Sequence, residues 1–393
     1  MDSPQTATRV LEPMALEVVT DTTGLGRLRA DYERLTGLTG TDLPFSYNEW
    51  HVAWCSHFLA AGGWVRASSK IYVVYDTAKL CVAIVPMIWT RRRFGPLGVT
   101  TLDILGPDPA ISEIRAPLVA PGYEAPVAAM VQRQLAIESG WDWVRWTGLN
   151  SAFGHELARH AHLQWEEPLF AYVLDLPAQW ELLHASLKRN IRESLRHCYN
   201  ALKRDRLEFS LRVARDPLPV RAALGRFLEL HTLRKRQSGS VPHKDYFDGE
   251  RPRAFLYDVC HRLALRDAVR VYELLVDGKV VAARVGFVVG SGLYLYYSGF
   301  DPRWRRYSVM TTTVAEAIKH AIGEGLRTVN FSTGTDVSKT RWGPRKVIYG
   351  NAFQVARSPK SRIAHALYRR WRPILDASPI AEVRWNPWRR RWR

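Results

Sequence analysis

The chain has 393 residues, more than one hydrophobic core usually organises, so its length favours two domains. Apolar residues make up 47% and charged residues 24%, which excludes disorder over most of the chain. The formal net charge is +18. Half of this excess lies in residues 357–393, which hold eleven Lys and Arg against two acidic residues.

The four cysteines, Cys55, Cys81, Cys198 and Cys260, form no CxxC pair and have no histidine spacing that would place two ligands on one metal. We therefore expect buried structural thiols, no metal site and a reducing compartment. Residues 1–17 lack the basic and then apolar regions of a signal peptide. No apolar run approaches the ~20 residues of a membrane span. These features predict a cytoplasmic protein.

The first half of the chain reads as a hairpin, a helix and a strand. Residues 70–75 and 80–90 are β-prone runs separated by a short polar turn, which predicts a hairpin. Apolar residues recur at helical spacing over 125–139. Residues 141–146 then form a short aromatic strand in this reading.

The second half repeats this order at greater length. Residues 180–202 predict one long helix with a single apolar face. A strand is expected over 208–213, followed by helices over 218–234 and 254–265. The polar stretch 237–253 between these helices is rich in Gly, Pro and His.

Three apolar runs, 269–276, 280–289 and 293–299, predict a β-meander. Asp277-Gly278 and the turn 290–292 separate these runs and supply the positive φ angles that short hairpins require. This meander is the strongest local prediction in the chain.

A polar turn (301–308), a helix (309–322) and a strand (327–331) follow the meander and predict a crossover unit. A helix that begins after a central strand offers unpaired N–H groups and the positive end of its dipole to a pyrophosphate. The turn contains three arginines, Arg303, Arg305 and Arg306. Taken alone, these residues fit a solvated basic turn about as well as an anion site.

These segments resemble a known family. Residues 272–283 and 293–301, Tyr307-Ser308, and 331–342 look like the acetyltransferase domain of CelD-type proteins. Such proteins are GNAT-fold, BioF-like, often tied to cellulose or exopolysaccharide synthesis, and related to the FemAB peptidoglycan aminoacyltransferases. Residues 45–50 also match, and the resemblance covers about 43–356.

The resemblance implies an α/β fold with mixed sheets, built from two tandem GNAT-like domains, which agrees with the repeated element order. We expect a disordered N-terminus over residues 1–14 and an N-terminal GNAT-like domain over 15–178. The C-terminal GNAT-like acetyltransferase domain would span 179–356. A basic tail rich in Trp and Arg would occupy 357–393.

The resemblance further implies an acyl group, in most cases acetyl, carried on coenzyme A as a co-substrate, with no permanently bound cofactor. An amine or hydroxyl of a cell-envelope polysaccharide or small molecule would attack the thioester directly. The family's phosphate loop normally has glycine where this chain has Val309 or Met310. The residues expected at the cofactor are Arg303, Arg305, Arg306, Ser308, Val309 and Met310.

Four residues are candidates for catalysis. Glu273 would be a general base if it faced the cleft, and an outward solvated carboxylate is the alternative. Tyr297 would donate a proton to the departing thiolate, unless it packs in the core. Asp336 and Lys339 follow the strand that ends near residue 331, where open sheets place their ligands.

His231 and Arg234 are the candidate substrate-binding residues. They end a predicted helix before the polar loop, where the family pattern often has an arginine that precedes an acceptor-side loop. A basic cluster that caps the helix and interacts with its dipole explains the same residues without a substrate.

Three functions remain open. The first is acyl transfer from acyl-coenzyme A. The second is transfer from aminoacyl-tRNA, as in the Fem relatives, which the basic charge and the absent glycines favour. The third is a non-catalytic GNAT-like module that binds an anionic glycan, lipid or partner in a polysaccharide-synthesis complex.

The basic tail adds a question of partners. Residues 361–372 are compatible with a basic helix, and Trp385, Trp388 and Trp392 alternate with arginines. This composition is typical of a segment that rests on an anionic membrane surface, here the inner face of the cell membrane. It also fits a contact with nucleic acid such as tRNA, or a solvated tail with no partner.

Overall fold

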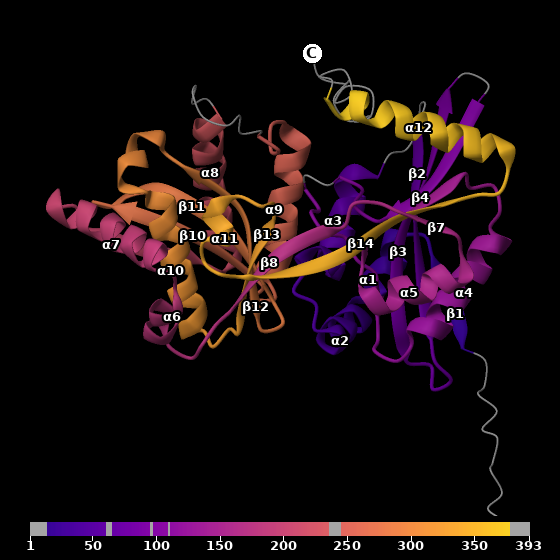
Figure 1. Ribbon diagram of the computed structural model, residues 1–393, viewed down its shortest axis with the longest axis horizontal. Helices are drawn as coiled ribbons and strands as arrows, with labels where there is room; N and C mark the ends of the chain where they lie inside the picture. Colours follow the sequence, from indigo (N-terminus) through magenta and orange to yellow (C-terminus); the bar gives the residue numbers. More distant parts are fainter. Residues whose placement is uncertain (1–13, 60–64, 95–96, 109–110, 236–244, 378–393) are drawn as a thin grey trace, which may run out of the picture.

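The computed structural model describes residues 14–59, 65–94, 97–108, 111–235 and 245–377 (Figure 1). The predicted disordered N-terminus and the tryptophans at the end of the tail lie outside these residues. The first half of the chain contains β1 (Ala15–Val19), α1 (Thr22–Arg27), α2 (Arg29–Thr39), η1 (Pro44–Ser46), α3 (Asn48–Phe58), β2 (Val65–Tyr75), β3 (Cys81–Phe94), β4 (Leu97–Ile104), β5 (Leu118–Val119), α4 (Glu124–Ile137), β6 (Trp143–Leu149), α5 (Ser151–His160) and β7 (Leu163–Trp165).

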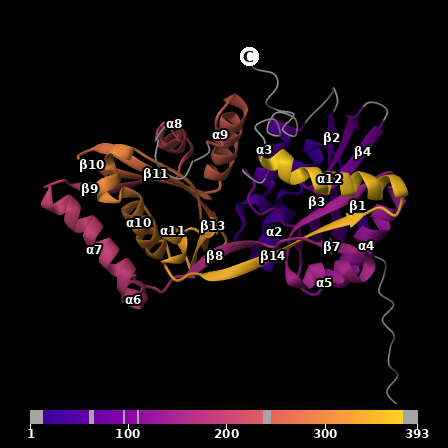
Figure 2. The same ribbon diagram turned by 45° about the horizontal axis from the view of Figure 1, so that its top comes forward.

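The second half contains more helix. Its elements are β8 (Leu169–Asp175), α6 (Trp180–Ser186), α7 (Arg189–Arg204), β9 (Phe209–Ala214), α8 (Pro217–Lys235), α9 (Glu250–Ala264), β10 (Val269–Val276), β11 (Lys279–Val289), β12 (Gly292–Phe300), η2 (Pro302–Tyr307), α10 (Val309–Gly323), β13 (Thr328–Thr333), α11 (Val337–Thr340), β14 (Arg345–Val355) and α12 (Pro359–Ala377). Helices α8 and α9 lie on one face of the strands β9–β13, and α7 and α10 lie on the other (Figure 2).

The strands form one continuous mixed sheet in the order β1-β2-β3-β4-β6-β14-β8-β13-β12-β11-β10-β9. Strand β14 joins the two halves, because residues 345–349 pair with β8 and residues 350–355 pair with β6. Figure 1 shows β8 and β14 as the long arms that connect the two lobes. The predicted α/β fold with mixed sheets and two GNAT-like halves is confirmed, and the halves also share strands. The domain boundaries themselves stay a prediction.

The predicted elements of the meander are confirmed, with strands β10, β11 and β12 in antiparallel register. Asp277 and Gly278 have φ angles of 47° and 75°, as a tight hairpin requires. The expectation of one helix over 180–202 is wrong. The chain becomes extended at Leu187 and Lys188, and this break lets both α6 and α7 bury leucines in the same core cluster.

An aromatic cluster holds the two halves together. The ring of Trp50 in α3 lies 5.3 Å from Phe255 of α9 and 5.7 Å from Phe287 of β11. Phe45 lies 5.3 Å from Tyr294 of β12. Edge-on aromatic contacts of this kind add to the burial of apolar area. The halves therefore share a core rather than touching across a polar interface.

Two features of the sequence can be placed directly. All four cysteines are free thiols in buried positions, as expected. Within the described ranges, no helix is long and apolar enough to cross a membrane.

Candidate functional site

Strands β12 and β13 separate along their length and open the sheet. They are parallel and paired only from Gly292 to Tyr294 on β12, against Thr328 to Asn330 on β13. Beyond these pairs β12 continues to Phe300 and β13 to Thr333 without further strand pairing between them. The gap lies at the carboxyl ends of the two strands, where open α/β sheets bind ligands.

A cavity of about 340 Å³ occupies this gap. Ser298 and Phe300 line it from β12, and Phe331 lines it from β13. The first turn of α10 closes one end. No carboxylate lines the cavity in the described part of the chain, whereas five cationic side chains do: Arg234, Arg284, Arg305, Lys339 and Arg341.

The start of α10 points its N–H groups at the cavity. Thr311 and Thr312 donate to the Ser308 carbonyl, so the N–H groups of Val309 and Met310 precede the first helical hydrogen bond. Ser308 has a φ of 52°, in the left-handed region that favours glycine. The Val309 side chain is buried in the core. Ser308, one residue before the expected glycine position, therefore adopts the strained backbone conformation that glycine would favour.

The three arginines of the turn have different surroundings. Arg305 lines the cavity. Arg303 instead forms an ion pair with Asp301 at 2.6 Å, and its side chain is 86% exposed. Arg306 lies over the ring of Tyr307 and 3.9 Å from Asp205. Only Arg305 of these three is placed to contact a ligand in the gap.

Helix α8 brings the two predicted substrate-binding residues beside β12. A Cβ on Gly299 would meet the His231 backbone nitrogen at 2.4 Å, so only glycine allows this approach. Arg234 lines the cavity and donates to Ser298 Oγ at 3.4 Å. His231 is fully buried, with Nδ1 2.9 Å from the Ser298 carbonyl oxygen. The position of Arg234 fits a substrate-binding role, whereas His231 fixes α8 to β12 through its hydrogen bond with Ser298.

A buried polar centre lies next to the cavity. The Tyr294 hydroxyl donates a hydrogen bond to the Glu113 carboxylate, which comes from the first half of the chain. Burial raises the pKa of Glu113, and the bonds from Tyr294 and Ser332 and the charges of Lys339 and Arg284 oppose this effect. A raised pKa makes a carboxylate a stronger proton acceptor than an ordinary one, as a general base requires.

The loop that carries Glu113 is fixed on both sides. Trp50 Nε1 donates to Ser112 Oγ at 2.9 Å, and the Tyr296 hydroxyl donates to the Ile111 carbonyl at 2.7 Å. A Cβ on Gly148 would lie 2.0 Å from the Arg115 carbonyl oxygen. The loop therefore crosses β6 in close contact, and Glu113 is held by packing from both halves.

Lys339 joins the polar centre to the cavity. Its Nζ lies 3.2 Å from Ser332 Oγ and also bonds the Thr333 carbonyl. Burial lowers the pKa of Lys339, and the neighbouring Arg284 lowers it further. Asp336 lies 3.7 Å from Nζ but has a 56% exposed side chain outside the cavity lining. Asp336 therefore acts on Lys339 rather than on a ligand.

Tyr297 lies on the α8 side of β12. Its ring is 5.8 Å from His231 and 5.3 Å from Phe247. Burial raises the pKa of Tyr297, and the charge of Glu113 raises it further, so the phenol keeps its proton at neutral pH. Tyr297 lies outside the cavity lining, and its role as a proton donor stays a prediction.

Glu273 does not fit the predicted role of general base. Its carboxylate is fully buried and accepts hydrogen bonds from Arg212 of β9 and Arg226 of α8. These bonds lower the pKa of Glu273 despite its burial. A carboxylate held by two guanidinium groups is a poor proton acceptor, so this geometry does not support the general-base prediction. The burial of Glu273 contradicts the alternative of an outward solvated Glu. Glu273 forms structural ion pairs with Arg212 and Arg226.

Sequence reasoning missed Glu113, Arg284 and Arg341. Glu113 stands in a loop whose sequence gives no periodic signal. Arg284 could have been found, because it is the one charged residue within the apolar run 280–289. Burial lowers the pKa of this arginine to about 10.

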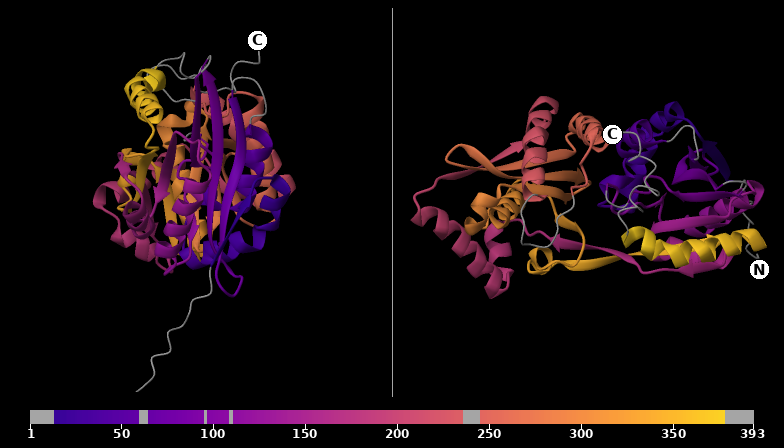
Figure 3. Two further views of the ribbon diagram at one scale, coloured as in Figure 1. Left: turned by 90° about the vertical axis from the view of Figure 1, so that its right-hand side faces the viewer. Right: turned by 90° about the horizontal axis from the view of Figure 1, so that it is seen from above.

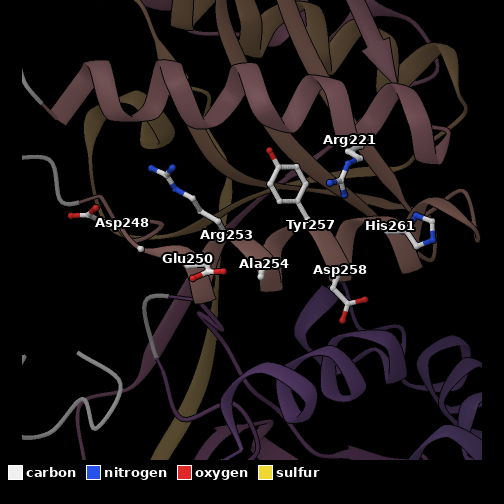
Figure 4. Close-up of a pocket in the computed structure, with 9 residues that line it drawn as sticks. Arg221, Asp248, Glu250, Arg253, Ala254, Tyr257, Asp258 and His261 are labelled. Atoms are coloured by element: carbon white, nitrogen blue, oxygen red, sulfur yellow. The ribbon is translucent and has the colours of Figure 1, made fainter. Parts of the chain in front are cut away.

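A second hollow of about 880 Å³ lies between α8 and α9 (Figure 4). Figure 4 shows Arg221 beside Tyr257, and the guanidinium lies 5.1 Å from the ring centroid. Asp258 pairs with Arg262 and lies 3.1 Å from His57. No strand residue lines this hollow in the described part of the chain, so it does not reach the gap in the sheet.

One family model matches the part of the chain that contains this gap. Residues 188–340 match the family described as an acetyltransferase (GNAT) domain. This match to part of the chain supports an acyltransferase enzyme. The match includes the gap, the first turn of α10 and Lys339. A comparison with curated protein sequences gave no match.

Solved structures share the fold at low identity. The crystal structure of FemX has a TM-score of 0.57 and 11% identity, covering 90% of this chain and 99% of that one. The C-terminal domain of a putative lysylphosphatidylglycerol synthetase from Agrobacterium fabrum has a TM-score of 0.50 and 12% identity, covering 88% and 97%. A weaker structural match is a tandem GNAT protein from the clavulanic acid biosynthesis pathway, with a TM-score of 0.42 and 11% identity, covering 87% of this chain and 98% of that one.

Proposed function

We propose that the chain transfers an acyl group, in the first instance acetyl, from a coenzyme A thioester to an amine or hydroxyl. The gap between β12 and β13 carries this proposal. Its cavity combines apolar walls from Phe300 and Phe331 with five cations and no carboxylate. Such a site suits a ligand with an apolar arm and a phosphorylated end.

The donor's phosphates would lie at the first turn of α10. The N–H groups of Val309 and Met310, the helix dipole and the side chains of Arg305 and Arg341 converge there. The thioester arm would follow β12 toward Ser298. This orientation brings the acyl carbon toward Lys339 and the polar centre.

Glu113 would then accept the proton that the acceptor loses as it attacks the acyl carbon. Its raised pKa and its hydrogen bond from Tyr294 support this role. Lys339, as the cation, would stabilise the oxyanion that forms on the acyl oxygen. The thiolate of coenzyme A would leave as the carbonyl re-forms, and Tyr297 is the proposed proton donor to it.

Transfer from aminoacyl-tRNA is the second candidate. The Fem-type relatives of the resembled family take aminoacyl groups from tRNA. Helix α7 contacts η2 and α10. One of its faces carries an exposed row of cations that is longer than one nucleotide and could follow a nucleic-acid backbone. This row comprises Lys188, Arg192, Arg196 and Lys203.

The acceptor and the setting are part of the proposal. The resemblance to CelD-type proteins rests on sequence motifs alone and favours a cell-envelope glycan or small-molecule acceptor, with the enzyme in the cytoplasm. A contact between the basic tail and an anionic membrane is proposed separately, because a different surface carries it.

Calorimetric titration of the full chain separates these functions. Acetyl-coenzyme A, coenzyme A, adenosine 3′,5′-bisphosphate and an aminoacyl-tRNA would each be added to the same preparation. Tight binding of the two coenzyme A ligands, with release of free thiol on adding amines, is the expected result. Binding of aminoacyl-tRNA alone would replace the first candidate by the second. No binding of any donor would favour a non-catalytic module.

A further inference from the structure

Helix α12 is anchored on the first half by one face. Ser361 Oγ donates to Asp142 Oδ1 at 2.8 Å. The ring of Tyr368 stacks on Trp143 of β6 at 5.3 Å, and His365 lies 4.8 Å from Phe353 of β14. These contacts pack one face of α12 against the first half of the chain. Figure 3 shows α12 on the outside of the molecule, along the first half.

The exposed side of α12 carries two large apolar residues among its arginines. Ile363 and Leu367 stand one turn apart, and 62% and 53% of their surfaces are exposed. A helix already packed on one side normally presents polar residues on the other. The outward pair is therefore an apolar stripe without a partner in the described chain.

Cations flank this stripe. Between residues 357 and 370 the chain has no acidic residue. Lys360 pairs with Asp142 at 3.3 Å. The other basic side chains form no ion pair with any described residue: Arg357, Arg362, Arg369 and Arg370.

A basic groove runs beside α12. Its volume is about 1140 Å³, and Leu135, Trp141 and Val355 contribute apolar walls. No carboxylate lines it within the described residues. Four arginines line it: Arg357, Arg362 and Arg369, and Arg159, which pairs with Glu156. Three histidines also line it: His160, His162 and His365. Burial lowers the pKa of His365, so the arginines carry the positive charge of the groove.

We propose that α12 docks on an anionic lipid bilayer. Ile363 and Leu367 enter the boundary between headgroups and acyl chains, while Arg362, Arg369 and Arg370 contact lipid phosphates. The groove adds positive potential next to the headgroups. A nucleic acid would complement the charge but would leave the Ile363–Leu367 stripe exposed, so the stripe decides in favour of lipid.

Vesicle flotation with the full chain tests this. Binding is expected to phosphatidylcholine vesicles that contain phosphatidylglycerol, and little binding to phosphatidylcholine alone. The triple variant Arg362→Gln, Arg369→Gln, Arg370→Gln should lower the vesicle partition coefficient roughly a hundredfold, at about fivefold for each arginine. The variant Ile363→Ser, Leu367→Ser should lower it by about tenfold or more.

Matched variants control for charge and hydrophobicity. Arg189→Gln, Arg192→Gln, Arg196→Gln on α7 removes the same charge elsewhere. Ile137→Ser, Leu218→Ser replaces side chains that are 76% and 81% exposed. Both controls should bind vesicles like the native chain. Equal losses in the controls, or retention of vesicle binding by both α12 variants, would overturn the proposal.

A tRNA-binding assay distinguishes nucleic acid from lipid as the anionic partner of α12. If α12 binds lipid, the variant Ile363→Ser, Leu367→Ser loses vesicle binding and keeps its affinity for unfractionated tRNA. A native chain that binds tRNA through the α12 arginines but ignores anionic vesicles would contradict the proposal. Far-ultraviolet circular dichroism of each variant confirms that the fold is retained.

Discussion

The Tyr294 hydroxyl donates a hydrogen bond to the Glu113 carboxylate across the two halves of the chain. Neither half alone contains this pair. Because Glu113 comes from the first half while the cavity is built by the second, the polar centre forms only when both halves pack together. The two GNAT-like halves therefore share one polar centre as well as one core.

Tyr294→Phe should move the acidic limb of the pH–rate profile to higher pH. The bond from Tyr294 favours the carboxylate and lowers the pKa of Glu113, so its removal raises that pKa. The carboxylate is the proposed base, and activity would then be lost at a higher pH than in the native enzyme. Steady-state acyl transfer measured across pH checks this.

Glu113→Gln is the companion variant. It should reduce kcat by roughly 10²–10⁴-fold and remove the acidic limb, as expected when a general base is lost. An unchanged limb in Tyr294→Phe, together with near-native kcat in Glu113→Gln, would show that Glu113 is structural only.

Arg305→Gln should raise the KM for the acyl donor by roughly tenfold, the value of one charge-assisted hydrogen bond. Arg305 lines the cavity, whereas Arg303 is held by Asp301 two residues earlier. Arg303→Gln is therefore the matched control and should leave KM within about twofold. Equal effects of the two substitutions would mean that the turn acts through its net charge.

Glu273→Gln should lower the free energy of unfolding by about 1–3 kcal/mol at neutral pH, because it weakens a buried carboxylate's bonds to two arginines. Both arginines are partly exposed, which keeps the expected loss at this scale. Since the pKa of Glu273 is lowered, its contribution exists above the unfolded pKa and disappears as pH falls through the folded one.

Urea titrations of Glu273→Gln at several pH values check that prediction. The two stability curves should converge at acidic pH, and kcat should stay near native. Glu193→Gln, on a 48% exposed side chain of α7, serves as the control and should change stability by less than about 0.5 kcal/mol. A large loss of kcat without a loss of stability would restore Glu273 as a candidate base.

Gly299→Ala should destabilise the fold by about 1–3 kcal/mol, because its Cβ would meet backbone atoms of His231 and Leu230 at 2.4 and 2.7 Å. Backbone atoms of α8 have little freedom to move aside. Gly37→Ala in α2 is the opposite case, with nothing within 4 Å of its Cβ. It should stabilise the protein by up to about 1 kcal/mol, through helix propensity. Thermal and urea unfolding measure both.

Local elements were predictable from sequence where turn chemistry and periodicity agreed. The Asp277-Gly278 turn and the apolar runs beside it specify a hairpin by themselves, and α10 begins where the polar turn ends. The positions of Lys339 and Arg305 beside the gap were also predictable, because Lys339 follows β13 and Arg305 precedes α10.

Long-range contacts were not predictable in this way. The side on which Glu273 lies depends on Arg212 and Arg226, which are 61 and 47 residues away in sequence. The role of Glu113 depends on Tyr294, 181 residues away. No local pattern encodes these pairs, because each partner has an ordinary sequence context and only packing brings them together.

The late position of β14 in the sequence affects how the sheet forms during synthesis. Strand β6 pairs with β4 on one side and with β14 on the other. Leu149 of β6 pairs with Gly350, which is synthesised roughly 200 residues later. At about 5–20 residues per second, this leaves the β6 edge without its partner for about 10–40 s. An unpaired edge of a hydrophobic sheet is a template for aggregation. Nascent chains of this protein should therefore depend on chaperones that shield β6 until translation is nearly complete.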